Sequence, residues 1–148
     1  MTIYFYSTQE DYSEFSNFSQ HGFTLNGKYW PTVEHYFQAQ KFPGQALEER
    51  IRTASNPTQA KKLGRTRSVP LRADWETVKD NIMREAVLAK FSSHEDIKKR
   101  LLSTGKEKLV ENAPRDYYWG CGSNGSGKNR LGIILMETRK QLSMNNEQ

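Results

Sequence analysis

The residues best suited to carry chemistry lie in segment 30–42, which reads Trp-Pro-Thr-Val-Glu-His-Tyr-Phe-Gln-Ala-Gln-Lys-Phe. This segment predicts a helix with one carboxylate, Glu34, in its first turn. Pro31 tolerates the first helical position, and Thr32 can cap the helix. Because the helix dipole holds an N-terminal carboxylate in its ionised form, Glu34 suits a base or a stabiliser of positive charge better than a proton donor.

Helical spacing divides the side chains of this segment between two faces. An apolar face holds Val33, Tyr36 and Phe37, and a second face holds Glu34, Gln38 and Lys41 at positions i, i+4 and i+7. A simpler interpretation is that Glu34 only stabilises the helix start and points into solvent. Spacing alone leaves both interpretations open.

A second segment of unusual composition is 115–132, where eighteen residues contain three aromatics, one acid, five glycines and three bases. Glycine lets the backbone approach a ligand closely, and the start of the following helix, beside Lys128 and Arg130, can hold a phosphate. The aromatic residues could stack on a planar base, a contact worth about 1–3 kcal/mol per base in nucleic-acid systems. A flexible surface loop is the alternative.

Two phosphate motifs are matched only in part within this segment. The glycine–lysine pattern at 122–128 resembles a P-loop, but Asn129 stands where a magnesium-binding Ser or Thr should be, and 116–119 is not a buried strand. The glycine spacing at 120–125 matches a dinucleotide fingerprint but lacks a surrounding βαβ unit. We therefore expect neither a kinase or ATPase nor a dinucleotide-binding fold.

The other reactive side chains have no evident chemical partners. Cys121 lacks an identifiable base, so it is expected to be a small or incidental thiol. His35 lies about 100° around the helix from Glu34, which favours a structural role over a catalytic dyad. His21, His35 and His94 do not have metal-ligand spacing. The sequence predicts no metal and no cofactor.

The elements that must position these residues follow from periodicity and turn residues. Strands are predicted at Ile3–Tyr6, Phe23–Leu25 and Lys28–Trp30, with Asn26-Gly27 joining the last two as a hairpin. Helices are predicted after Thr32, at Ala46–Ala54 and at Pro57–Leu63. A long helix is predicted from the stripe Trp75, Val78, Ile82, Ala86 and Ala89, a separate one from Ser93 to about Leu102, and a last one over Leu131–Leu142. This pattern indicates a helix-rich α+β fold with a small antiparallel hairpin.

Some helix ends can be predicted as well. Gly64 is expected to be a C′ residue, and Asp74 is expected to cap the long helix. Ser93 and Asp96 are expected to form a capping box for the next helix. The final residues, 145–148, are expected to fray.

Composition fits a small enzyme made of one domain, residues 1–148. Hydrophobic residues make up 35 % of the chain, no apolar run reaches membrane-spanning length, and the first residues do not resemble a signal peptide. One cysteine excludes an internal disulfide, so a cytoplasmic location without membrane association is expected. The net charge of +5 favours an anionic partner, either nucleic acid or a phosphorylated small molecule, but no known nucleic-acid module is apparent.

Several motifs together are similar to a known family. They are FSNF at 15–18, WPTVEHYFQAQKF at 30–42, GR at 64–65, Trp75, DYYWG at 116–120 and GKNRLG at 127–132. They closely resemble the YbiA-like N-glycosidase family, part of the NADAR group, whose name reflects association with NAD and ADP-ribose. The resemblance extends from about Ile3 to Leu142, and it implies a single YbiA-like domain.

The resemblance implies hydrolysis of the C1′–N bond of ribosylamino-pyrimidine 5′-phosphates, early riboflavin-pathway intermediates, with release of ribose 5-phosphate. It implies that Glu34 is the catalytic carboxylate and that Asp116 is a second acidic group that assists the leaving nitrogen or fixes the ribose. Trp75, a core residue by spacing, and Trp119 are implied as aromatic walls around the base. The implied ribose and phosphate contacts are Asn17, Lys41, Arg65, Lys128 and Asn129.

Two other functions remain open from the sequence. One is an ADP-ribosyl glycohydrolase acting on ADP-ribosylated guanine or nucleotides, and only under this function is nucleic acid an expected partner. The other is a non-catalytic module that binds ADP-ribose or NAD. The presence of both Glu34 and Asp116 argues against the module, since binding alone needs no such pair.

Overall fold

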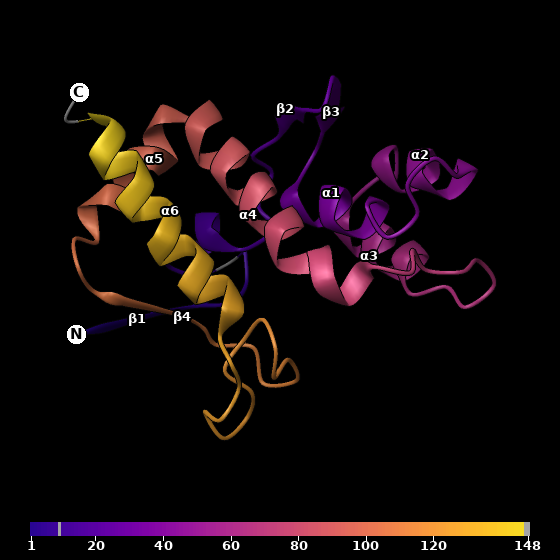
Figure 1. Ribbon diagram of the computed structural model, residues 1–148. Coiled ribbons are helices and arrows are strands. Elements are labelled where there is room, and N and C mark those ends of the chain that lie inside the picture. The colour runs from indigo at the N-terminus through magenta and orange to yellow at the C-terminus, as the bar shows by residue number, and fades with distance from the viewer. Residues whose placement is uncertain (9, 147–148) are drawn as a thin grey trace. The chain divides into compact units, whose positions relative to one another are not determined.

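The computed structural model describes residues 1–8 and 10–146. The chain forms two compact units, one made of residues 20–90 and the other of residues 1–19 and 91–148. Figure 1 shows a helix-rich chain with short strands, which confirms the α+β class and the small antiparallel hairpin. Within the described part, no helix is long and apolar enough to cross a membrane.

The hairpin of unit 20–90 forms at the predicted residues. Strand β2 (Phe23–Leu25) pairs antiparallel with β3 (Lys28–Trp30), and Leu25 lies opposite Lys28. Asn26 and Gly27 connect them with φ angles of 55° and 77°. Two successive residues with positive φ define the turn type for which Asn-Gly is the preferred pair, so this prediction is confirmed.

Helix α1 (Val33–Ala39) follows the hairpin directly, and Thr32 is its N-cap as predicted. The Thr32 Oγ1 accepts a hydrogen bond from the backbone N–H of His35 at 3.1 Å. Pro31 precedes the cap instead of occupying the first helical position. Every residue of α1 is buried, so the expectation that its second face could point into solvent is wrong.

Two short helices bury α1. Helix α2 (Ala46–Arg52), which ends two residues earlier than predicted, and helix α3 (Pro57–Gly64) both pack against it. Gly64 is the last residue of α3 and not the C′ residue expected from its type. A Cβ atom built on Gly64 would lie 2.8 Å from the Cδ of Gln38. Glycine is therefore required here for close packing of α3 on α1.

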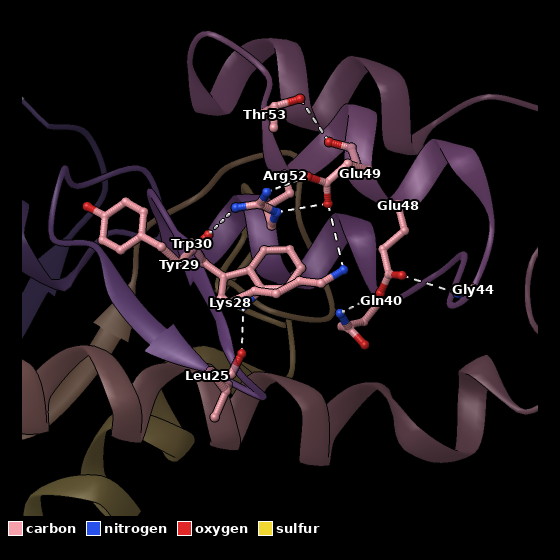
Figure 2. Close-up of polar contacts among 10 residues, drawn as sticks. All are labelled: Leu25, Lys28, Tyr29, Trp30, Gln40, Gly44, Glu48, Glu49, Arg52 and Thr53. Atoms are coloured by element: carbon pink, nitrogen blue, oxygen red, sulfur yellow. Dashed lines mark hydrogen bonds and ion pairs between the residues drawn. The ribbon is translucent and has the colours of Figure 1, made fainter.

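An ion-pair network holds α2 against the hairpin (Figure 2). Arg52 donates from Nη1 to the carbonyl of Tyr29 at 3.0 Å and from Nε to a carboxylate oxygen of Glu49 at 2.9 Å. The Lys28 Nζ lies 3.7 Å from that same carboxylate. Because Lys28 and Glu49 are exposed and Arg52 is only half-buried, this network aligns α2 with the hairpin but contributes little to stability.

The turn between α1 and α2 is organised by Glu48, also drawn in Figure 2. One Glu48 carboxylate oxygen accepts from the Gln40 side chain and the other from the backbone N–H of Gly44, both at 3.2 Å. Gly44 adopts a φ of 77°, which places it in the left-handed region that favours glycine. Glu48 thus fixes the path of the chain as it leaves α1.

The long helix α4 (Trp75–Ser93) begins after Asp74, whose carbonyl accepts from Thr77 N at 2.9 Å. Trp75, Ile82 and Ala86 of the predicted stripe are buried. Because α4 continues through Ser93, that residue cannot cap the next helix. His94 is the N-cap of α5 (Glu95–Ser103), so the predicted capping box is wrong.

In the unit of residues 1–19 and 91–148, strand β1 (Thr2–Phe5) pairs parallel with β4 (Lys108–Glu111). Strand β4 was not predicted, because only two of its four residues are apolar and its partner is distant in sequence. A short 3₁₀ helix, η1 (Ser13–Phe15), follows β1 along the chain. Phe15 packs edge-on against Phe5, with the ring centroids 5.9 Å apart.

Helix α6 (Arg130–Asn146) packs on β4, and Figure 1 shows it beside the β1–β4 pair. Its predicted apolar stripe is buried and consists of Leu131, Ile134, Leu135, Thr138 and Leu142. The predicted fraying is wrong for Asn145, which is helical. Residues 147 and 148 lie outside the described residues.

His35 has the structural role expected of it. Its Nε2 lies 3.0 Å from the Ala54 carbonyl, which only accepts hydrogen bonds, so Nε2 carries the proton. Its Nδ1 then accepts from the Thr32 hydroxyl at 2.8 Å. Burial lowers the pKa of His35, and the hydrogen bond to Ala54 opposes this in part. It is burial that favours the neutral imidazole.

We therefore expect the protein to lose stability as the pH falls below the ordinary histidine pKa of 6.5. The unfolded state binds a proton there that the folded state resists, so the free energy of unfolding decreases with decreasing pH. Thermal unfolding measured between pH 5 and 8 tests this. His35→Gln should flatten the dependence in this window, whereas the control His94→Gln should retain it. An unchanged slope in His35→Gln would contradict the assignment.

Candidate active site

Glu34 lies in the first turn of α1 and is only 8 % exposed. Its Oε2 accepts a hydrogen bond of 2.6 Å from the Nε2 of Gln38, one helical turn further along. The i, i+4 spacing places the two side chains on the same side of the helix. The structure thus encloses the carboxylate and gives one of its oxygens a fixed partner.

Three cationic side chains act on this carboxylate: Lys61 of α3, Lys41 just after α1, and Arg65 just after α3. Burial raises the pKa of Glu34, while the hydrogen bond from Gln38 and these three positive charges oppose the rise. The expectation that the helix dipole would hold Glu34 ionised gave the wrong direction for the pKa. Desolvation of the charged form is the largest of these effects on the Glu34 pKa.

Lys41 lies within the same cluster and not out in solvent. Its Nζ donates to the Gly64 carbonyl at 3.3 Å and lies 5.8 Å from the ring centroid of Trp75 and 5.9 Å from that of Phe37. Burial lowers the pKa of Lys41, and the charge of Glu34 opposes this. Trp75 and Phe37 pack edge-to-face at 5.0 Å, so Trp75 is a core residue that also adjoins the cation. Contact of Trp75, Lys41 or Arg65 with the substrate stays a prediction.

The Glu34 carboxylate and the cations around it can support a particular kind of reaction. A buried carboxylate with one oxygen already bonded can use the other to accept a proton from water or to stabilise positive charge that develops close to it. Such interactions are stronger in a site of low dielectric than in water. The surrounding cations favour a ligand that carries negative charge of its own. The cluster therefore suits an anionic substrate that becomes positively charged at its reacting atom.

Asp116 has a structural function in the second unit. Its Oδ1 accepts from the backbone N–H groups of Tyr118 at 3.0 Å and Trp119 at 2.8 Å. A carboxylate that bonds to the backbone two and three residues ahead stabilises a turn. A catalytic role for Asp116 stays a prediction, and the turn explains its position without one.

The glycine-rich segment pairs with itself and does not form an open phosphate cradle. Five consecutive N–H groups, of residues 127–131, donate to carbonyls of residues 117–121 at 2.7–3.0 Å. The donor–acceptor pairs are Gly127 to Cys121, Lys128 to Tyr117, Asn129 to Gly120, Arg130 to Tyr118 and Leu131 to Trp119. The expectation that backbone N–H groups at the start of this helix bind a phosphate is therefore wrong for these donors.

Lys128 itself is exposed, with its Nζ 5.5 Å from the ring centroid of Tyr118. Tyr118 in turn packs edge-to-face on Trp119, with the ring centroids 4.8 Å apart. A cation beside a pair of aromatic rings could contact an anionic ligand through its side chain alone. Contact of Trp119 and Lys128 with the substrate stays a prediction.

Asn129 secures the entry to α6. It adopts a φ of 52°, its Oδ1 accepts from the N–H of Glu111, and its Nδ2 donates to the carbonyl of Leu109, both at 2.9 Å. The amide thus completes the hydrogen bonding of β4, a role that was missed because β4 was not predicted. Contact of the buried Asn17 or of Asn129 with the substrate stays a prediction.

The structure brings together four of the predicted site residues in unit 20–90, namely Glu34, Lys41, Arg65 and Trp75. The others belong to the second unit: Asn17, Asp116, Trp119, Lys128 and Asn129. Sequence reasoning did not assign Gln38, Lys61 or Gly64 to the site. Helical spacing from Glu34 marks Gln38, but the other two come from α3 and have no local signal.

Metal-ligating side chains do not gather in the described part of the chain, where no group of three or more His, Cys, Asp or Glu residues could hold an ion. The expectation of a metal-free and cofactor-free protein stays a prediction. The Cys121 thiol donates weakly to the Asn112 side chain at 3.5 Å and to the Gly122 carbonyl at 3.4 Å. These contacts fit the expected incidental thiol.

Comparisons with known proteins identify what the whole chain is similar to. A sequence model of the NADAR domain matches residues 4–143. N-glycosidase YbiA of Shigella boydii serotype 4 (strain Sb227) is 53 % identical over 142 residues, covering 96 % of this chain and 89 % of that protein. The NMR structure of the E. coli protein YbiA matches with a TM-score of 0.92 at 50 % identity, covering 99 % of this chain and 88 % of that one.

A plant relative has a more specific name. The riboflavin biosynthesis protein PYRR, chloroplastic, of Zea mays is 41 % identical over 155 residues. That match covers 95 % of this chain and 25 % of the plant protein.

The charge balance around Glu34 can be measured directly. We expect its carboxyl, followed by ¹³C NMR, to titrate above the ordinary value of 4.5. Lys61→Gln should raise the Glu34 pKa further, because it removes a positive charge that favours the ionised form. Lys62→Gln, an exposed neighbour on the same helix, is the matched control and should leave it unchanged. Titration of Glu34 at or below 4.5 would show that burial does not dominate.

Proposed function

The chain belongs to the NADAR family and is an N-glycosidase, and we propose that it hydrolyses the C1′–N bond of ribosylamino-pyrimidine 5′-phosphates. The products are ribose 5-phosphate and an aminopyrimidine. The observation that carries the proposal is the buried carboxylate of Glu34 among Lys41, Lys61 and Arg65. The name of the Zea mays relative supports a substrate from riboflavin biosynthesis.

The chemistry of the bond explains why a buried carboxylate is useful. Departure of the nitrogen leaves positive charge at C1′ in an oxocarbenium-like transition state. On the alternative route the ring C1′–O4′ bond breaks first, and the nitrogen, still attached, shares the positive charge with C1′ as an iminium that water attacks. Glu34 stabilises that charge and accepts a proton from the attacking water. The water oxygen bonds to C1′, the C1′–N electron pair stays with nitrogen, and the nitrogen gains a proton to leave as an amine.

The cations of the cluster select the substrate by charge. A ribosyl 5′-phosphate carries negative charge remote from the breaking bond, and Lys41, Lys61 and Arg65 favour its approach. Binding energy from a remote phosphate can be used to hold the reacting atoms in place. Trp75 provides an aromatic surface beside Lys41 against which a planar base can pack.

The residues of the second unit have proposed roles that follow from the family resemblance. Asp116 assists the leaving nitrogen or fixes the ribose, and Trp119 is the second aromatic wall. Asn17 and Asn129 contact the ribose, and Lys128 contacts the phosphate through its side chain.

Glu34→Gln should abolish most of the activity without affecting the fold. Replacing the carboxylate by an amide of the same shape should lower kcat by a factor on the order of 10²–10⁴. Release of ribose 5-phosphate measures this loss. The assay contains EDTA, and the wild-type protein should keep full activity in it, because every catalytic role is assigned to a side chain. The control Glu95→Gln changes an exposed first-turn glutamate of α5. A loss of less than about tenfold in Glu34→Gln would reduce Glu34 to a structural residue.

A parallel assay that follows release of ADP-ribose from ADP-ribosylated guanosine tests the alternative substrate. Turnover of the ribosylamino-pyrimidine 5′-phosphate supports the proposal. Turnover of ADP-ribosylated guanosine alone would replace it with the ADP-ribosyl glycohydrolase. Binding without release of sugar from either compound would indicate a module that only binds.

The Lys128 assignment can be tested with two substrates. If Lys128 contacts the 5′-phosphate, Lys128→Ala should cost about 1–3 kcal/mol in kcat/KM, the scale of a hydrogen bond to a charged group. The loss should be much smaller with the dephosphorylated riboside, because the partner of the lysine is then absent. Lys140→Ala, an exposed lysine on α6, is the control. Equal losses on both substrates would remove the phosphate assignment.

A further inference from the structure

Gln38 combines deep burial with an unsatisfied polar atom. The side chain is 5 % exposed, and its Oε1 has no hydrogen-bond partner among the described residues. A buried acceptor without a partner destabilises a fold, and an apolar side chain of similar length would avoid that loss. The acceptor end of the amide therefore adds nothing to stability, and its donor end indicates what the side chain does.

The other end of the amide contacts the site. The Gln38 Nε2 donates to Glu34 Oε2 at 2.6 Å, a short charge-assisted hydrogen bond. This contact engages Oε2 of Glu34 and leaves Oε1 of Glu34 for a ligand. A carboxylate held at one oxygen has less rotational freedom than one that is held at neither.

Gly64 makes room for this amide. A Cβ atom at Gly64 would lie 2.8 Å from Gln38 Cδ and 2.9 Å from Gln38 Cβ, closer than side chains tolerate. Any larger residue at 64 must therefore displace the glutamine. The carbonyl of Gly64 also accepts the hydrogen bond from Lys41. One glycine at the end of α3 thus adjoins both the amide that contacts Glu34 and a cation of the cluster.

We propose that Gln38, seated against Gly64, is a positioning residue that holds Oε2 of Glu34 and so directs the other oxygen to the reacting water. The inference rests on the proposed function, since it assigns a task to the partner of the catalytic carboxylate. Gln38 does not touch the substrate. It acts through Glu34.

Loss of this hydrogen bond has a predictable effect on pH dependence. Donation by an N–H group favours the ionised carboxylate, so its removal raises the pKa of Glu34. The charged groups that act on Glu34 in the described structure are Lys61 of α3, Arg65 after it, and Lys41 after α1. All three remain in place when Gln38 is replaced. The acidic limb of the profile of kcat/KM against pH should therefore move to higher pH.

The experiment measures that profile for Gln38→Ala, Gly64→Ala and the double variant. Gln38→Ala should move the acidic limb upward and lower kcat on the order of tenfold to a hundredfold, as when a partner that orients a functional ligand is lost. Gly64→Ala should move the limb in the same direction, because it displaces the amide. Gly64→Ala in the Gln38→Ala background should move it no further, since no amide is left to displace.

A matched control exists on the same helix end. Gln40 donates to Glu48 at 3.2 Å, a glutamine–glutamate contact outside the Glu34 cluster. Gln40→Ala should leave the acidic limb unmoved. If Gln38→Ala does not fold, Gln38→Met retains the length of the side chain without the N–H donor and should produce the same shift.

The outcomes separate this inference from the proposed function. An acidic limb that stays in place in Gln38→Ala or Gln38→Met, while Glu34→Gln is inactive, overturns the positioning role and leaves the proposed function standing. Additive shifts in the double variant overturn the part assigned to Gly64. Full activity of Glu34→Gln overturns the proposed function itself.

Discussion

The removal of the Glu34 carboxylate from water is the constraint on which the rest of the site depends. A buried charge is strongly unfavourable unless it is paired and hydrogen-bonded. The ionised carboxylate is favoured by a hydrogen bond from one amide on the same helix and by three cations from neighbouring segments. These partners do not cancel the effect of burial, so the pKa of Glu34 remains raised. The result is a carboxylate more basic than one on the surface, which suits acceptance of a proton from water.

Contacts of α1 with its neighbours in unit 20–90 fix the position of Glu34. The hairpin ends at Trp30, and two residues later Thr32 caps α1 by accepting from the His35 N–H, which fixes where the helix starts. His35 ties the same turn to the carbonyl of Ala54, beyond the end of α2. Gly64 then allows α3 to approach α1 closely, which brings Lys61 toward the carboxylate. Burial of Glu34 is thus a property of how three short helices pack.

The sequence predicted what is decided locally. Asn26-Gly27 requires a particular turn, Thr32 is a strong cap, and the apolar stripes of α4 and α6 have clear helical spacing. Glu34 was identified by its place in a helix start and by family resemblance. Its raised pKa was not foreseen, because burial of a helix face depends on α2 and α3, which a periodicity argument does not place.

Sequence analysis also missed features that depend on partners distant along the chain, because local patterns do not place such partners. Strand β4 is short, and its pairing with β1 joins residues at opposite ends of the chain. The pairing of residues 117–121 with 127–131 uses backbone groups, which sequence motifs do not specify. It converts what resembled an open phosphate loop into a closed structure. Asn129 likewise acquires its role only through β4.

A crystal structure of the protein with ribose 5-phosphate bound tests the central claim most directly, because it locates the reacting carbon relative to Glu34. The account predicts that C1 of the sugar lies within about 6 Å of the Glu34 carboxylate, the reach of one hydrogen-bonded water. It also predicts that the Gln38 amide remains on Oε2. A sugar bound with C1 beyond the reach of Glu34, or a Glu34 carboxylate turned away from the ligand, would contradict it.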